Sequence, residues 1–172
     1  MRPFGFPHPV NETSARVVAG GVAAMATATV ALDQPWLLVP LTYGFAARVA
    51  TGPTLSPLGQ LATRVVTPRL RVRHRFSPGP PKRLAQAMGL ALSGTATLLH
   101  YRFGRRRAAY GVLGALIVAA GLESIFGVCL ACKLFPLLVK AGVVPQSVCE
   151  ECADIWSRPG RRERAPQTRP AA

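Results

Sequence analysis

Residues 108–128 read AAYGVLGALIVAAGLESIFGV, the longest of four apolar runs in the chain. The run contains a single charged residue, Glu123, and leads directly into a cysteine motif. A helix needs roughly 20 apolar residues to cross the hydrocarbon core of a bilayer. The stretch therefore predicts a membrane-spanning helix.

Three other apolar blocks precede this run, at residues 15–32, 35–50 and 84–101. The first block is long enough to span a bilayer, whereas the second is shorter and contains Pro40, which predicts a kink. Together the four blocks predict an all-α fold, an integral membrane bundle of four hydrophobic helices.

The third block carries small residues at every fourth position. They form a ridge that lets another helix approach closely, and they are Ala85, Gly89, Ser93 and Thr97. Leu92, on a different side of the same helix, is expected to face lipid. The ridge predicts a packing seam inside the bundle.

The composition is unusually apolar and basic, with 49% hydrophobic residues, 16% charged residues and a net charge of +14. The charges lie between the apolar blocks, as in membrane proteins with basic cytoplasmic loops, so we do not expect a nucleic-acid partner. Seven Lys and Arg residues in the 52–83 connection predict a multi-pass protein with both termini in the cytoplasm. The four arginines of the 101–107 connection then lie outside the cytoplasm, which conflicts with the rule that basic residues favour the cytoplasmic loops of membrane proteins.

Two segments outside the spans are predicted to rest on the bilayer. Ser56 followed by Pro57 is typical of a helix start, and predicts a short interfacial helix inside the basic loop. Residues 133–145 are apolar but interrupted by Pro136 and Lys140, which favours another interfacial stretch over a fifth span. We assign residues 1–156 to the membrane domain and residues 157–172 to a disordered basic tail attracted to anionic lipid.

All four cysteines lie within 24 positions, in the pattern C-x2-C-x16-C-x2-C. They are Cys129, Cys132, Cys149 and Cys152. Three interpretations remain open. The pairs relay disulfides or sulfur atoms, all four thiolates hold zinc or iron in a structural site, or the cysteines are inert packing residues.

The first pair is predicted to lie at the C-terminal end of the fourth helix, where apolar surroundings favour neutral thiols. Glu123 precedes Cys129 by six residues, so on a continuous helix it would face another side. We expect Glu123 to pair with Arg48 or with a hydroxyl of a neighbouring helix.

Other chemistry is not indicated. His8, His74 and His100 are scattered and do not predict metal ligands. The chain has no Walker loop, Rossmann glycine pattern or nucleophile elbow, so the sequence leaves open whether it is an enzyme.

The chain resembles a family of bacterial membrane proteins, domain of unknown function 4395. The resemblance covers roughly residues 6–156 and rests on FPHPVNETSAR, on the Trp36-Leu37-Leu38 opening of the second block, on FSPGPPKRLAQAMG and on GVCLACKLF. It implies a bacterial inner-membrane location and a shared cysteine motif, G-x-C-x-x-C-K-x-[FY], that falls on Cys129 and Cys132.

These observations together predict a membrane protein whose Cys129 and Cys132 form a redox pair without a bound cofactor. Its expected partners are the lipid bilayer and a soluble thioredoxin-like or sulfurtransferase protein. The alternative prediction is a non-enzymatic protein in which Cys129, Cys132, Cys149 and Cys152 bind a structural zinc or iron ion.

Overall fold

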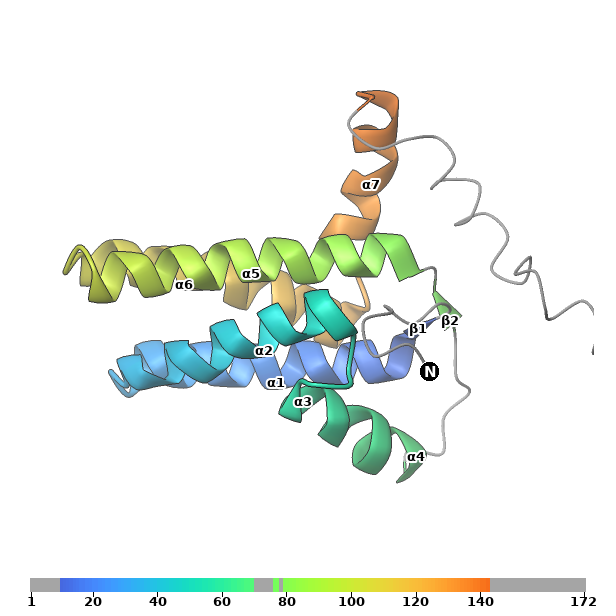
Figure 1. The fold of residues 1–172 in the computed structure, drawn as a ribbon, viewed down its shortest axis with the longest axis horizontal. Coiled ribbons are helices and arrows are strands. Elements are labelled where there is room, and N and C mark those ends of the chain that lie inside the picture. Colours follow the sequence, from blue (N-terminus) through green and yellow to red (C-terminus); the bar gives the residue numbers. More distant parts are fainter. Residues whose placement is uncertain (1–9, 70–75, 78, 143–172) are drawn as a thin grey trace, which may run out of the picture.

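The computed structural model describes residues 10–69, 76–77 and 79–142, and its core is a set of four long helices (Figure 1). These are α1 (Glu12–Ala31), α2 (Leu38–Thr51), α5 (Gly79–Tyr101) and α6 (Arg106–Gly121). They run alternately up and down, and each packs on two others, because α1 contacts α6 and α2 while α5 contacts the same two helices. The predicted all-α architecture is confirmed.

Shorter elements extend this core. A 3-10 turn η1 (Pro35–Leu37) precedes α2, and a π-helix η3 (Leu122–Phe126) continues α6. An arm beside α1 consists of α3 (Pro57–Gln60), the π-helix η2 (Leu61–Val66) and α4 (Thr67–Arg69). Helix α7 (Leu130–Lys140) projects steeply from the bundle, and β1 (Val10–Asn11) pairs antiparallel with β2 (Phe76–Ser77).

The bundle has two unlike ends. We call the end that carries the arm, α7 and the strands the cysteine end, and the opposite end, with its two short connections, the turn end (Figure 1). At the turn end Asp33 forms an ion pair with Arg106 and accepts a hydrogen bond from Tyr110. Arg106, one of the four arginines that this topology places outside the cytoplasm, is thus neutralised by Asp33.

Helix starts follow the local sequence. The Asn11 side chain accepts a hydrogen bond from the Thr13 amide at 2.9 Å, and the Ser56 side chain accepts one from the Gly59 amide at 3.2 Å, so both are N-caps. The predicted kink at Pro40 is wrong. Because α2 begins at Leu38, Pro40 lies in the first turn, where a missing N–H breaks no helical hydrogen bond.

The small-residue ridge of α5 packs against α2, as its spacing predicts. A Cβ atom added at Gly89 would overlap the ring of Phe45, and the hydroxyls of Thr42 and Thr97 are 2.9 Å apart across the same seam. Leu92 was expected to face lipid, but it lies against the core and lines a cavity. Gly89 therefore leaves the space that the Phe45 ring fills in this seam.

Among the described residues, two helices are long and apolar enough to cross a membrane, Glu12–Ala31 and Arg106–Phe126. In the most apolar 18-residue stretch of each helix, 33% of the residues of the first and 22% of those of the second are buried within the protein. Helix α2 has 14 residues, a length of roughly 21 Å, which is short of the roughly 30 Å hydrocarbon core. The structure thus supports two of the four predicted spans by length and composition.

Candidate functional site

The fourth long helix ends abruptly before the cysteine motif. Gly127 has a left-handed backbone (φ 69°), which a residue with a side chain rarely adopts and which stops the helix. Arg16 of α1 donates hydrogen bonds to the carbonyls of Ser124 at 3.2 Å and Ile125 at 2.7 Å. A cation on the exposed carbonyls of a helix C-terminus is favourable, so Arg16 holds this end in place.

The cysteine pair lies at the start of the next helix. Cys129 has an extended backbone and occupies the N-cap position of α7, and Cys132 lies in the first turn. The prediction that the pair ends the fourth helix is wrong, because the Gly127 turn separates that helix from α7. The positive end of a helix dipole favours thiolates, whereas the predicted location would have disfavoured them.

A buried ion pair lies beside the cysteines. Lys82 Nζ of α5 is 2.6 Å from Glu123 Oε1 of η3, and the two side chains are only 7% and 15% exposed. The expectation that Glu123 pairs with Arg48 or with a hydroxyl is therefore wrong. Lys82 is closer because the first turn of α5 lies against the end of the fourth helix.

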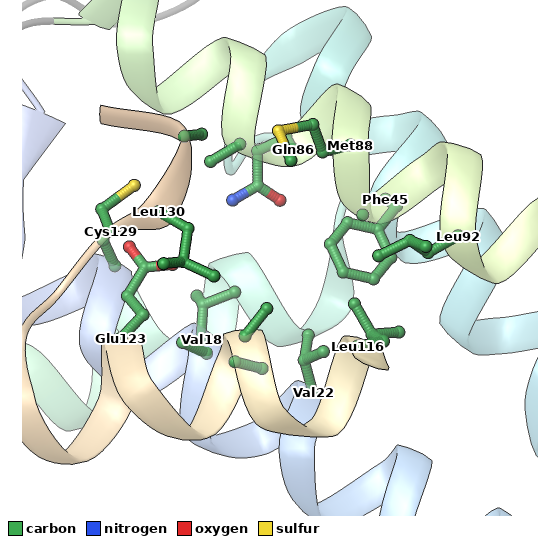
Figure 2. Close-up of a pocket in the computed structure, with 17 residues that line it drawn as sticks. Val18, Val22, Phe45, Gln86, Met88, Leu92, Leu116, Glu123, Cys129 and Leu130 are labelled. Atoms are coloured by element: carbon green, nitrogen blue, oxygen red, sulfur yellow. The ribbon is translucent and has the colours of Figure 1, made fainter. Parts of the chain in front are cut away.

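Glu123 and Cys129 share one wall of a cavity of about 80 Å³ (Figure 2). Gln86 lines the same cavity, and Phe45 and Leu92 lie across from the cysteine. The prediction that Glu123 faces away from the cysteines assumed one continuous helix, and the turn at Gly127 overturns it. Most of the remaining lining is apolar, so the thiol has mostly apolar neighbours.

The two thiols differ in acidity. A hydrogen bond from the Cys132 thiol lowers the pKa of Cys129 to about 7, and the nearby Lys82 ammonium adds to this, against desolvation and the Glu123 charge. The same hydrogen bond, together with burial, raises the pKa of Cys132. Cys129 is therefore the thiolate of the pair near neutral pH, and Cys132 remains protonated.

Alkylation of Cys129 by iodoacetamide should follow this acidity. In a variant with Cys149→Ser and Cys152→Ser, we expect the labelling rate of Cys129 to be half-maximal near pH 7. An ordinary cysteine, with a pKa of about 8.5, is only a few per cent thiolate there. Peptide mass spectrometry after timed labelling measures the rate for each cysteine. A midpoint at or above pH 8.5 would show that Cys129 is not activated.

The metal interpretation receives no support from the part of the chain that the structure describes. No three His, Cys, Asp or Glu side chains within residues 10–69 and 79–142 are grouped so as to hold a metal ion. His100 stacks near the rings of Tyr101 and Tyr110. Cys149, Cys152, His8, His74 and the tail of residues 157–172 lie outside the described residues, so the four-cysteine site stays a prediction.

Two residues of this site were not singled out from the sequence. Arg16 could have been found as the one charge inside the first apolar block, since such a charge needs a partner at a helix end. Lys82 lies two residues before the third block, and its closeness to Glu123 depends on how α5 packs against the other helices.

Comparison with known proteins identifies the family of this chain. The family model of a domain of unknown function, DUF4395, matches residues 10–140, which include the four long helices, Lys82 and both cysteines of the first pair. No curated protein and no solved structure matches the chain.

Proposed function

The chain belongs to the DUF4395 family, and we propose that it is a four-helix membrane protein that presents a reactive dithiol to the cytoplasm. In this proposal Cys129 and Cys132 exchange disulfides with a soluble thiol protein. The main observation that supports this proposal is the position of Cys129, whose thiol lies at the start of a helix beside a second thiol and has a lowered pKa.

The exposed surface supports insertion into a bilayer. Large apolar side chains on the four long helices and their ends are more than half exposed, which is unfavourable in water: Leu32, Val39, Leu98, Val118, Ile125 and Phe126. Exposed aromatic residues gather at the turn end, namely Trp36, Tyr101 and Phe103. Aromatic side chains favour the headgroup level, so the turn end suits one membrane interface.

The cysteine end suits the cytoplasmic interface. Five exposed basic residues lie on its arm, on the first turn of α5 and on α7: Arg64, Arg69, Arg83, Lys133 and Lys140. The turn end has four, Arg102, Arg105, Arg106 and Arg107, of which Arg106 is paired with Asp33. Helix α7 also leaves Leu134 and Leu137 exposed, as an interfacial helix does. A location at the inner headgroup level would bring the half-buried Cys132 to the water boundary, where a soluble protein can approach. Cys129 beside it is 8% exposed, so a partner must displace the side chains that cover Cys129 before its thiolate can attack.

The exchange proceeds through two thiolate attacks. The Cys129 thiolate attacks one sulfur of a partner disulfide, an intermolecular S–S bond forms, and the second partner sulfur leaves as a thiolate. Cys132 passes its proton to that thiolate and attacks Cys129 Sγ, which releases the first partner sulfur as a thiolate that takes a proton from water. The chain ends with a Cys129–Cys132 disulfide, and the partner has gained two electrons and become a dithiol.

A serine at Cys132 should trap this intermediate. In Cys132→Ser the first attack still occurs, but the thiol that resolves the mixed disulfide is absent, so we expect a covalent adduct with a soluble thiol protein on non-reducing gels. Cys129→Ser is the matched control and should give no adduct, because it lacks the attacking thiolate.

The outcome of this pair of variants shows which cysteine is the attacking thiolate and which is the resolving thiol. Equal adducts from both variants would contradict the assignment of Cys129 as the nucleophile. No adduct from either variant in membranes, with both thiols accessible to a small reagent, would contradict thiol exchange.

A further inference from the structure

Arg48 of α2 is a buried cation without an acidic partner in the described structure. Its side chain is 5% exposed, although an isolated charge is costly to bury. Three acids lie among the described residues: Glu123 pairs with Lys82, Asp33 pairs with Arg106, and Glu12, in the first turn of α1, makes no ion pair there. The charge of Arg48 is thus not compensated by any described carboxylate.

The contacts of the guanidinium are neutral and incomplete. Nε donates to Gln86 Oε1 at 2.7 Å, Nη1 donates to Ser56 Oγ at 3.0 Å, and the group lies 4.5 Å from the centre of the Phe45 ring. Nη2 has no hydrogen-bond partner in the described structure. Since a guanidinium has five N–H donors, more than half of them are left for another acceptor.

Space for such an acceptor lies directly beside Arg48. A cavity of about 170 Å³ at the cysteine end is lined by Arg48, Lys82, Gln86, Asn11 and Thr63. A single water needs roughly 15 Å³ on the same measure, so the cavity holds a group much larger than water. Its walls are mostly apolar, and they bring two amides together with two cationic side chains, of which Lys82 is paired with Glu123.

The amides are oriented to donate. Gln86 uses its oxygen to accept from Arg48, and Asn11 uses its oxygen to accept from the Thr13 amide, so the NH₂ groups of both remain for a ligand. Arg48 also lines a second cavity of about 120 Å³, and its guanidinium lies near Gly44, where a side chain would crowd it. The missing side chain at Gly44 thus leaves the space that the guanidinium occupies between the two cavities.

We propose that this cavity binds an oxoanion group of the phosphate or sulfate type, with Arg48 as its principal contact. A guanidinium offers paired N–H groups that match the oxygens of such anions. The group belongs either to a free anion or to the headgroup of an anionic lipid. A headgroup can reach the cavity because the cavity lies at the cysteine end, which the proposed function places at the headgroup level. The proposal does not depend on the thiol chemistry.

Thermal unfolding of the full chain in phosphatidylcholine nanodiscs tests the proposal in two arms. One arm adds inorganic phosphate or sulfate, and the other replaces part of the lipid with phosphatidylglycerol. A bound anion at 100 times its Kd should raise Tm on the order of 5 °C. A rise with the added salts identifies a free anion, and a rise only with phosphatidylglycerol, retained in native mass spectrometry, identifies a lipid headgroup.

Arg48→Gln should abolish the rise, and Arg83→Gln is the matched control. Arg83 is exposed at the same end, is not among the residues that line the cavity, and within the described structure donates to the Val49 carbonyl, so its loss should preserve the rise. If Arg48→Gln does not fold, Arg48→Lys keeps the positive charge and tests whether the guanidinium itself is needed. We expect Arg48→Lys to weaken anion binding at least tenfold. No rise in either arm, or a rise of equal size at equal concentrations in Arg48→Gln or Arg48→Lys, would overturn the proposal.

Discussion

Replacing Lys82 with methionine should cost about 3–5 kcal/mol of unfolding free energy, since it leaves Glu123 as a buried charge without its partner. Methionine retains much of the side-chain volume, so the loss reports the broken ion pair rather than an empty space. Unfolding of the detergent-solubilised protein by SDS, monitored by circular dichroism, measures the change in unfolding free energy.

Two further variants isolate the pair. Lys82→Met combined with Glu123→Gln removes both charges and should recover most of the loss. Arg83→Met removes a neighbouring exposed charge from the same turn of α5 and should cost well under 1 kcal/mol. A single variant at Lys82 that is as stable as the one at Arg83 would show that Glu123 has another partner.

Replacing Gly89 with leucine should prevent α2 and α5 from packing, at a cost of about 3 kcal/mol or more. Even the first side-chain carbon would overlap the ring of Phe45, and that ring is buried. The same measurement of unfolding in detergent applies, with loss of folded protein during purification as the extreme result.

Gly94→Leu is the matched control on the same helix. A Cβ atom at Gly94 meets nothing within 4 Å, so leucine there faces open space and should be tolerated. A combined variant, Gly89→Leu with Phe45→Ala, should regain part of the lost stability because the ring that causes the overlap is removed. Equal stability of the two leucine variants would contradict the close approach of α2 and α5.

The features that local sequence determines were predictable. An N-cap depends on one side chain and an amide two or three residues away, so Ser56 was identified without knowledge of the fold. The ridge on α5 was also predictable, because small residues at every fourth position lie on one side of any helix. Its partner residue, Phe45, was not, since it belongs to another helix.

The chemistry of the site depended on features that sequence periodicity does not reveal. One left-handed glycine, Gly127, turns a continuous apolar run into two helices and moves Cys129 from the end of one to the start of the next. The Lys82–Glu123 pair joins residues 41 positions apart, and it forms only after α5 packs against η3. Such contacts follow from tertiary packing, whereas the CxxC spacing only indicated which residues to consider.

A redox titration of the first cysteine pair tests the central claim, that Cys129 and Cys132 form a reversible dithiol. The full chain with Cys149→Ser and Cys152→Ser is equilibrated in glutathione buffers, and maleimide labels the remaining free thiols for counting by intact mass. We expect a single two-electron transition from two labelled thiols to none, with one midpoint potential. Two thiols that stay reduced across the titration would contradict the claim, as would wild-type protein that holds one zinc or iron ion and protects all four thiols from labelling.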